Sequence, residues 1–164
     1  MRKRPLLEKD VLLDLFTLDQ GKMTVTAKGV KKITSRRAPH LQTGNLVHFE
    51  LQERHERWYL QQSQLISGFT AVRDHERRTS VMYILLFVLD RILPDAAPEP
   101  DVYILARRFM AEISRSEENE PAILKKYLYD VMVSLGYVQG EKTMKELIMI
   151  IEEIIHEKIP FRII

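Results

Sequence analysis

Six cations lie close together in a stretch of the chain that holds no acidic side chain. The stretch runs from Gly21 to Gln42, inside a longer segment between Asp19 and Glu50 that contains no carboxylate. Ammonium and guanidinium groups that protrude from a polar segment can neutralise phosphates whatever the base sequence. We therefore predict a sequence-independent nucleic-acid contact here, and the alternative is a solvated loop whose charges only aid solubility. The cations are Lys22, Lys28, Lys31, Lys32, Arg36 and Arg37.

A second basic group surrounds the chain's single tryptophan. Trp58 follows Arg57 directly and lies four residues after Arg54, with His55 between them. Bases stack on exposed aromatic rings, and arginines can hold the flanking phosphates. One interpretation therefore adds Arg54, Arg57 and Trp58 to the nucleic-acid contacts, provided that the indole is exposed. The other is that Trp58 closes a hydrophobic core, with Tyr59 on the opposite face of the same strand.

The sequence offers no constellation typical of an enzyme. It contains no cysteine, which excludes disulfides, thiolate zinc sites and cysteine nucleophiles. No two of its five histidines are four residues apart, as the helix of a metalloprotease site would require. Neither a Gly-x-Ser-x-Gly motif nor a Gly-rich phosphate-binding loop is present. We expect no catalytic residue, no metal and no other cofactor.

Composition and charge bound the class of protein. The 164 residues, of which 45% are hydrophobic, can form one medium domain or two small ones with a packed core. No apolar run approaches the roughly 18 residues of a membrane span, and the basic start does not predict a signal peptide. Residues 1–66 contain 12 Lys and Arg against 7 Asp and Glu, whereas residues 67–164 contain 13 against 16. An anion-binding surface is therefore expected in the first half.

Short segments of alternating polarity occupy the first half of the chain. Met23 to Lys28 alternates apolar with polar residues, as a half-buried strand does, and Gly29 ends the pattern. Turn signals at Asp19-Gln20-Gly21 and Gly44-Asn45 separate this segment from its neighbours. Such strands, joined by polar turns, predict a small closed or nearly closed barrel of the OB type. The expected strands are 9–17, 23–28, 46–51 and 58–66, with a hairpin loop at 53–56.

The second half changes to a helical period. Apolar residues recur at helical spacing from Val81 to Ile92, and Pro94 ends that helix before a stiff linker at 95–100. Another helix is expected at 101–113, and a third opens at Glu120-Pro121 and is capped by Gly136. Thr143, with Glu146 three residues later, gives the capping-box pattern of a last helix. The expected fold class is α+β, with an OB-fold barrel at residues 1–68 and an all-α helical domain at 69–164.

An ordered set of residues runs through the N-terminal region and continues more loosely into the second half. The N-terminal positions are Glu8, Asp10, Leu13, Phe16-Thr17, Gly21, Ala27-Lys28-Gly29, Lys31-Lys32, Ser35 and Leu41-Gln42. The later positions are Leu89-Asp90, Leu93, Glu120-Pro121-Ala122 and Leu135-Gly136-Tyr137. In this order of residues the chain resembles the RecO family of recombination mediators, and about four fifths of it can be laid along the family.

The resemblance implies an OB fold followed by a helical domain, in a non-enzymatic DNA repair and recombination protein of the bacterial cytoplasm and nucleoid. It implies binding to single- and double-stranded DNA and annealing of complementary strands. It also implies contacts with single-strand-binding protein and RecR, and indirectly with RecA, which the family helps to load. By motif match, the main DNA-contact candidates are Lys28, Lys31, Lys32, Arg36 and Arg37. The helix that begins at Glu120-Pro121 aligns with the region where the family docks the tail of single-strand-binding protein, so Lys125 and Lys126 are weak candidates for the partner contact.

Two features differ from the family pattern, and two other functions stay open. Family members usually begin with an additional strand, whereas this chain starts almost inside the Glu/Asp motif. Either the start is misassigned, or the first barrel strand is shortened to Arg2 to Leu6, which would leave an open edge. Many members carry a four-cysteine zinc module, but only Val138 to Lys142 spans that place, so zinc is not expected.

One alternative is an adaptor that binds single-strand-binding protein or RecR with little DNA binding of its own. The other is an RNA-binding OB protein, which would share the same electrostatics.

Overall fold

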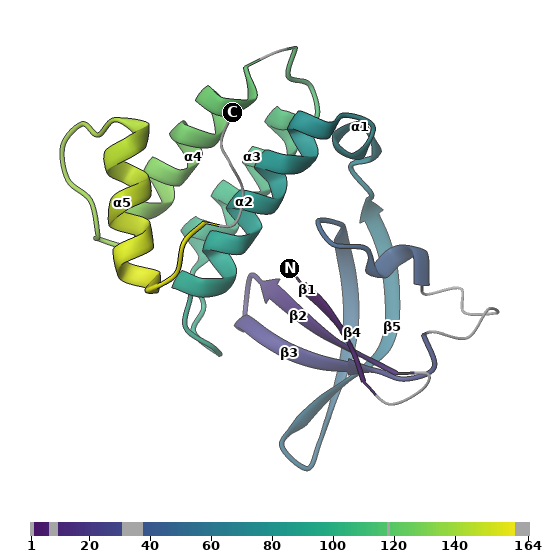
Figure 1. Ribbon diagram of the computed structural model, residues 1–164. Coiled ribbons are helices and arrows are strands. Elements are labelled where there is room, and N and C mark those ends of the chain that lie inside the picture. Colours follow the sequence, from purple (N-terminus) through teal and green to yellow (C-terminus); the bar gives the residue numbers. More distant parts are fainter. Residues whose placement is uncertain (1, 7–9, 31–37, 118, 160–164) are drawn as a thin grey trace.

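The structure is a computed structural model that describes residues 2–6, 10–30, 38–117 and 119–159. A curved sheet formed by the first part of the chain lies beside a group of helices formed by the second (Figure 1). The strands are β1 (Arg2–Pro5), β2 (Val11–Thr17), β3 (Gly21–Ala27), β4 (Leu46–Arg54) and β5 (Arg57–Ser67), with a 3-10 helix η1 (Ala38–Leu41). The helices are α1 (Thr70–Arg73), α2 (Glu76–Ile92), α3 (Pro100–Ile113), α4 (Glu120–Ser134) and α5 (Met144–Ile155).

The five strands form one sheet in the order β1-β2-β3-β5-β4. Neighbouring strands are antiparallel except β3 and β5, which run parallel with Val25 beside Trp58. The curvature encloses a hydrophobic core of the sheet's own, as in the OB fold that the sequence predicts. The buried residues of this barrel core are Val11, Leu13, Leu15, Met23, Val25, Ala27, Val30, Leu41 and Leu60.

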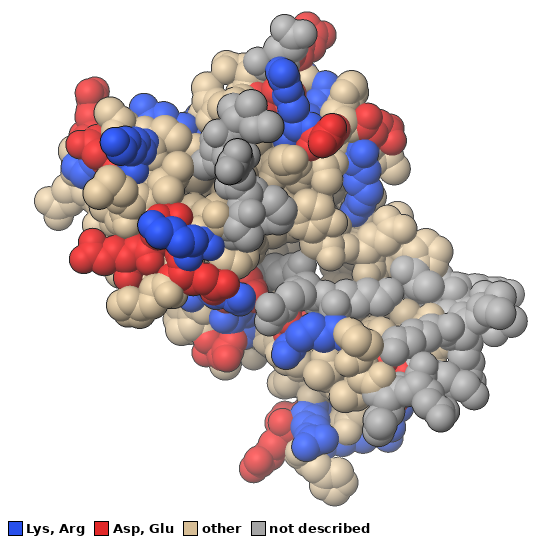
Figure 2. Space-filling model, viewed as in Figure 1, with Lys and Arg blue, Asp and Glu red and all other residues tan. Residues whose placement is uncertain are grey.

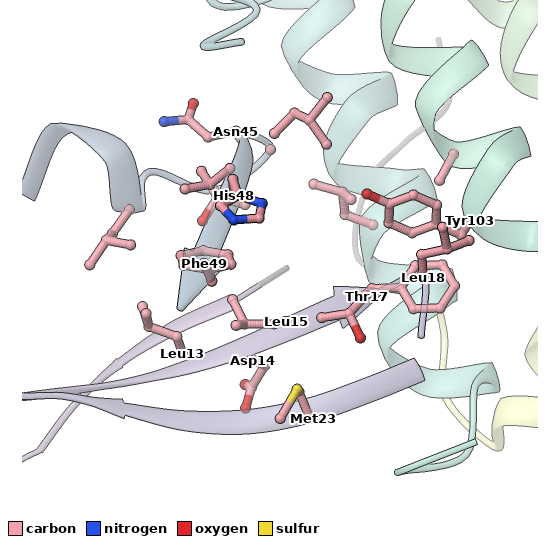
Figure 3. A pocket seen from close by; sticks show the side chains of 18 of the residues that line it. Leu13, Asp14, Leu15, Thr17, Leu18, Met23, Asn45, His48, Phe49 and Tyr103 are labelled. Carbon is pink, nitrogen blue, oxygen red and sulfur yellow. The ribbon is translucent and has the colours of Figure 1, made fainter. Parts of the chain in front are cut away.

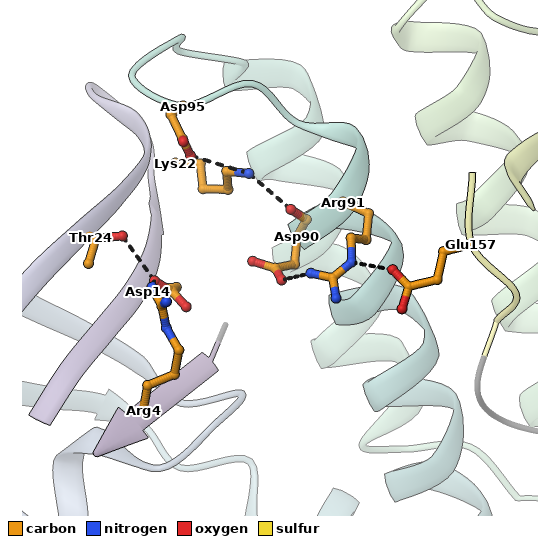
Figure 4. A network of polar contacts seen from close by, with 8 residues as sticks. All are labelled: Arg4, Asp14, Lys22, Thr24, Asp90, Arg91, Asp95 and Glu157. Atoms are coloured by element: carbon orange, nitrogen blue, oxygen red, sulfur yellow. Dashed lines mark hydrogen bonds and ion pairs between the residues drawn. The ribbon is translucent and has the colours of Figure 1, made fainter. Parts of the chain in front are cut away.

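The barrel is open along one side. β1 is four residues long and pairs with β2 only from Val11 to Asp14, so the last three residues of β2 extend beyond it. Within the described ranges, no pairing joins β1 to β4 at the other edge of the sheet. Arg4 donates a 2.6 Å hydrogen bond to the buried Asp14 carboxylate, which holds the short edge strand in place (Figure 4). The predicted open edge therefore lies at β1.

The hairpin between β4 and β5 is tighter than the predicted loop at 53–56. β4 continues to Arg54 and β5 begins at Arg57, so only His55 and Glu56 form the turn. Both turn residues have a positive φ, of 49° and 57°. A two-residue turn with two left-handed residues matches the twist of the flanking strands, and glycine usually occupies such positions. The sequence His-Glu carries no turn signal, so the sequence alone predicts a four-residue loop where the structure has a two-residue turn.

The helices surround a second hydrophobic core. α2 lies at its centre and contacts α1, α3, α4 and α5. The predicted capping box opens α5, because the Thr143 hydroxyl accepts from the Glu146 amide and the Glu146 carboxylate accepts from the Thr143 amide at 2.8 Å. None of the helices in the described part is long and apolar enough to cross a membrane. The two separate cores agree with two structural parts, although the exact boundary at residue 68 stays a prediction.

The start of β3 joins the barrel to the helical part. The backbone amide of Ala96, in the linker between α2 and α3, donates to the carbonyl of Lys22 at 2.8 Å. The Lys22 ammonium donates to the carbonyl of Asp90 at 2.9 Å and lies 3.3 Å from the Asp95 carboxylate (Figure 4). Gly21 has a φ of +67°, and a Cβ there would overlap the backbone of Ala97. The close approach of two backbones therefore requires glycine at this position.

We predict that Gly21→Ala destabilises the protein more than Gly140→Ala does. Both glycines have a positive φ, but nothing lies within 4 Å of a Cβ at Gly140. The left-handed conformation should cost each variant about 1–2 kcal/mol. The overlap with Ala97 should cost Gly21→Ala roughly 1–3 kcal/mol more. Urea unfolding of the two variants measures the difference, and equal losses would show that the joint yields without strain.

Candidate nucleic-acid interface

The outward face of β3 is polar along its whole length. Met23, Val25 and Ala27 are buried in the barrel core, so the intervening Thr24 and Thr26 lie on the outside of the sheet. The period of two that the sequence shows is therefore confirmed. Lys28 follows directly after the strand and is exposed.

Trp58 and Tyr59 lie on opposite sides of β5, as adjacent residues of a strand must. Trp58 is partly buried and packs against the barrel core, in phase with the fully buried Leu60. Tyr59 is half-buried on the outer side, where it pairs with Thr26 of β3 and Gln52 of β4. Trp58 therefore lies on the inner side of the sheet, where it also lines the pocket beside helices α2 and α3, and its role as a nucleic-acid contact stays a prediction. The apolar phase of Trp58 and Leu60 is the signal that distinguishes the two sides.

The ammonium group of Lys28 lies over the ring of Tyr59. Its nitrogen is 4.9 Å from the ring centroid, which is within the range of a cation–π contact. A hydrogen bond holds the turn that carries Lys28, because the amide of Gly29 donates to the Asp10 carboxylate at 2.8 Å. Tyr59 was missed as a candidate, although it stands beside the tryptophan that was selected.

Two arginines of the β4–β5 hairpin lie on the same side of the sheet as Tyr59. Gln52 is directly opposite Tyr59, and two residues further along, Arg54 is directly opposite Arg57. Arg54 donates two hydrogen bonds to the side-chain oxygen of Gln52, at 3.0 and 2.6 Å. Cross-strand neighbours on one side of a sheet have their Cβ atoms about 5 Å apart. We call this surface the Tyr59 face and define it as Thr26, Lys28, Gln52, Arg54, Arg57 and Tyr59.

Four of the predicted cations lie outside the described residues. These are Lys31, Lys32, Arg36 and Arg37. The residues on either side of their segment are described: Val30 and Leu41 are both buried in the barrel core. In the sequence, the segment begins three residues after Lys28. Its role in DNA binding stays a prediction.

Lys22 has a different environment from the other predicted cations. Its side chain is only 16% exposed, and its ammonium contacts Asp90 and Asp95 in the joint with the helices. A phosphate could reach it only by disrupting that joint. We therefore leave Lys22 out of the proposed interface. The sequence could not show this, because both partners are about seventy residues away.

The two partner-contact candidates lie on α4, and they differ in their contacts. Lys126 forms a 3.0 Å ion pair with Glu112 of α3 and lies 4.9 Å from the centroid of the Tyr127 ring. Tyr127 donates to the same carboxylate at 2.7 Å, and this hydrogen bond, followed by the one from Lys126, lowers the pKa of Glu112. Lys125 is exposed. The partner role of both lysines stays a prediction.

The rest of the described surface differs from the Tyr59 face, because it carries charges of both signs and a pocket. Acidic and basic side chains are interspersed over α5, on the helical part (Figure 2). A pocket of about 520 Å³ lies between the open side of the barrel and helices α2 and α3, with Leu15, Phe49 and Tyr103 among its lining residues (Figure 3). Within the described ranges, no group of three or more His, Asp or Glu residues could hold a metal ion.

Comparison with known proteins identifies the family. Residues 1–69 match the family model described as "Recombination protein O N terminal". The chain is 31% identical over 140 residues to the DNA repair protein RecO of Marinobacter nauticus, covering 84% of this chain and 56% of that protein. The chain belongs to the RecO family. The OB-fold barrel is the part that the family model matches.

Other RecO proteins match the chain over similar lengths. The protein of Geobacter metallireducens is 28% identical over 110 residues, which cover 67% of this chain and 45% of that protein. The protein of Pseudoalteromonas atlantica is 26% identical over 140 residues, covering 84% of this chain and 56% of that protein. The chain thus spans about half the length of the curated RecO relatives that it matches.

We predict that Tyr127→Phe raises the pKa of Glu112 toward its ordinary value. Burial, followed by the hydrogen bond to Glu112, raises the pKa of Tyr127 to about 12. Because the pKa of Tyr127 is raised in the folded protein, its contribution to the free energy of unfolding is present below pH 10 and is lost as pH rises through about 12. The pKa of Glu112 is lowered, so its contribution is present above pH 4.5 and is lost as pH falls below that value. Because Glu112 is 40% exposed, we expect the variant to lose only about 1 kcal/mol at neutral pH.

A carboxylate NMR titration measures this effect. Tyr129→Phe is the control, because that hydroxyl donates to the carbonyl of Gly140 and not to Glu112. An unchanged pKa of Glu112 in Tyr127→Phe would contradict the assignment of the hydrogen bond.

Proposed function

We propose that this chain is a DNA-binding part of a DNA repair and recombination mediator, and that it acts without catalysis. The observation that carries the proposal is the Tyr59 face, where Lys28, Arg54 and Arg57 lie on one side of an OB-fold barrel. The basic segment at 31–37 follows Lys28 in the sequence and adds four cations to the proposal. Membership of a family whose relatives are named DNA repair protein RecO supports the same role.

Binding would come from release of the counterions that surround phosphates. Cations on a sheet and an adjacent segment contact the backbone and not the base edges, so affinity should depend little on sequence and fall steeply with salt. Single and double strands would both bind, because both present phosphates. A surface that neutralises two approaching strands would also favour their annealing, since it lowers the repulsion between them.

The proposed partners are other proteins of DNA repair. They are single-strand-binding protein, RecR and, indirectly, RecA, and the proposed outcome is the loading of RecA on coated strands. The adaptor alternative draws on a different surface, because Lys125 of α4 is exposed on the helical part, away from the Tyr59 face. In that alternative the helices recruit a partner and the barrel holds little DNA.

We predict that reversing the three described cations of the Tyr59 face weakens binding and flattens its salt dependence. The variant combines Lys28→Glu, Arg54→Glu and Arg57→Glu. If four to six phosphates are engaged, log K for the unaltered protein should fall with log salt at a slope of about −3 to −4. Each lost contact on a single strand should reduce the slope by about 0.7, so the variant should retain about −1 to −2. Fluorescence anisotropy of a labelled strand of about 30 nucleotides gives both values.

The control variant reverses three exposed cations of the helical part, through Arg115→Glu, Lys125→Glu and Lys145→Glu. It changes the net charge by the same amount as the Tyr59-face variant. A local contact would weaken binding only in the Tyr59-face variant, whereas a general charge effect would weaken it equally in both. Equal slopes for the two variants would reject the Tyr59 face as the binding surface. A weak, flat response of the unaltered protein, with retention of the tail of single-strand-binding protein, would favour the adaptor. A matched RNA strand that binds more tightly than DNA would favour the RNA-binding alternative.

A further inference from the structure

Tyr59 is an aromatic side chain placed on a polar surface. Within the described ranges, neither hydrophobic core includes it, whereas its neighbour Trp58 packs against the barrel core. Its cross-strand partners are Thr26 and Gln52, and the ammonium of Lys28 lies over its ring. Packing of the barrel therefore does not explain an aromatic ring at this position.

The ring lies between groups that can hold phosphates. Lys28 is at 4.9 Å on one side, and Gln52, directly opposite Tyr59, accepts both hydrogen bonds from Arg54 on the other. Along β5, Arg57 is two residues before Tyr59 and thus on the same side of the sheet. A nucleic-acid backbone that contacts these cations would place a base next to the phenol ring.

The contact between Lys28 and the ring is weak enough to be exchanged for a base. A cation–π contact at an exposed site changes an equilibrium constant by about two- to five-fold. Stacking of one base on an aromatic side chain changes it by about five- to 150-fold. When the ammonium moves from the ring to a phosphate, it keeps a favourable partner. The exchange is therefore favourable where base stacking and the phosphate contact together outweigh the contacts that Lys28 leaves.

We propose that Tyr59 is a base-stacking position, and that Lys28 covers its ring until a nucleic-acid strand takes the ammonium onto a phosphate. This inference rests on the proposed function and deepens it, because it names the ligand that the Tyr59 face prefers. Every base has a flat π surface, so the contact does not select a sequence. Bases in a duplex are already stacked on each other. The Tyr59 face should therefore favour single strands over duplexes of the same length.

The experiment compares three ligands of equal length: a single strand of about 30 nucleotides, the same strand with abasic sites throughout its central part, and the duplex. Each is titrated by fluorescence anisotropy across a salt series. The variants are Tyr59→Leu, which removes the π surface, and Tyr59→Phe, which keeps it. Tyr137→Leu is the matched control, because Tyr137 is 49% exposed and lies on the helical part.

Tyr59→Leu should lower the affinity for the intact single strand by about five- to 150-fold. It should leave the affinities for the abasic strand and the duplex within about two-fold, and it should not alter the salt slope, because no charge is removed. Tyr59→Phe and Tyr137→Leu should bind all three ligands as the unaltered protein does. Lys28→Met should instead reduce the slope by about 0.7 on single strands, since it removes one phosphate contact.

The unaltered protein provides a test that depends on no variant. It should bind the intact strand at least about five-fold more tightly than the abasic strand. Equal affinity for these two strands would overturn the inference, and so would an equal loss on all three ligands in Tyr59→Leu, which would indicate a structural role. In both cases a steep salt slope would leave the proposed function standing. Absence of binding to any ligand would reject the proposed function together with the inference.

Discussion

The alternation of side chains along β3 is the constraint on which the other features of the barrel depend. The strand pairs with β2 on one edge and β5 on the other, so its register sets the facing of both neighbours. Its apolar residues fill the core, and its polar residues must then face outward. A slip of one residue would exchange the two sets and bury charge in the core. The same register turns Trp58 inward and Tyr59 outward, so the two rings face opposite sides of the sheet.

The electrostatic character of the Tyr59 face follows from the tight hairpin. A two-residue turn forces Arg54 and Arg57 into direct opposition, and like charges placed in this way disfavour the folded hairpin by several tenths of a kcal/mol. The side-chain oxygen of Gln52 offsets part of this repulsion by accepting from Arg54. The carboxylate of Glu53 is on the other side of the strand, opposite Trp58, and so does not neutralise the pair. An anion between the two arginines would relieve the remaining repulsion.

The sequence predicts those features that depend on local patterns. The capping box at Thr143 and the end of the helix at Ile92 follow from neighbouring residues, and both are confirmed. The strand predicted at 23–28 begins two residues earlier and ends one residue earlier, as β3 (Gly21–Ala27). The OB-fold followed by helices was accessible from the ordered resemblance to the RecO family. The sequence could not predict the environment of Lys22, because Asp90 and Asp95 approach this lysine only after the two parts of the chain have packed together. The short hairpin was missed for another reason, since His55 and Glu56 adopt left-handed conformations that their residue types rarely take.

The inward position of Trp58 has a spectroscopic consequence. It is the chain's only tryptophan, and its indole packs against the barrel core and lines the pocket that faces helices α2 and α3. Intrinsic fluorescence excited at the indole band therefore reports on the barrel and its pocket, whereas far-ultraviolet circular dichroism is dominated by the four long helices of the described part. The two signals separate the melting of the barrel from that of the helices without any added label. Coincident transitions would mean that the joint at Gly21 and Lys22 makes the two parts unfold as one cooperative unit.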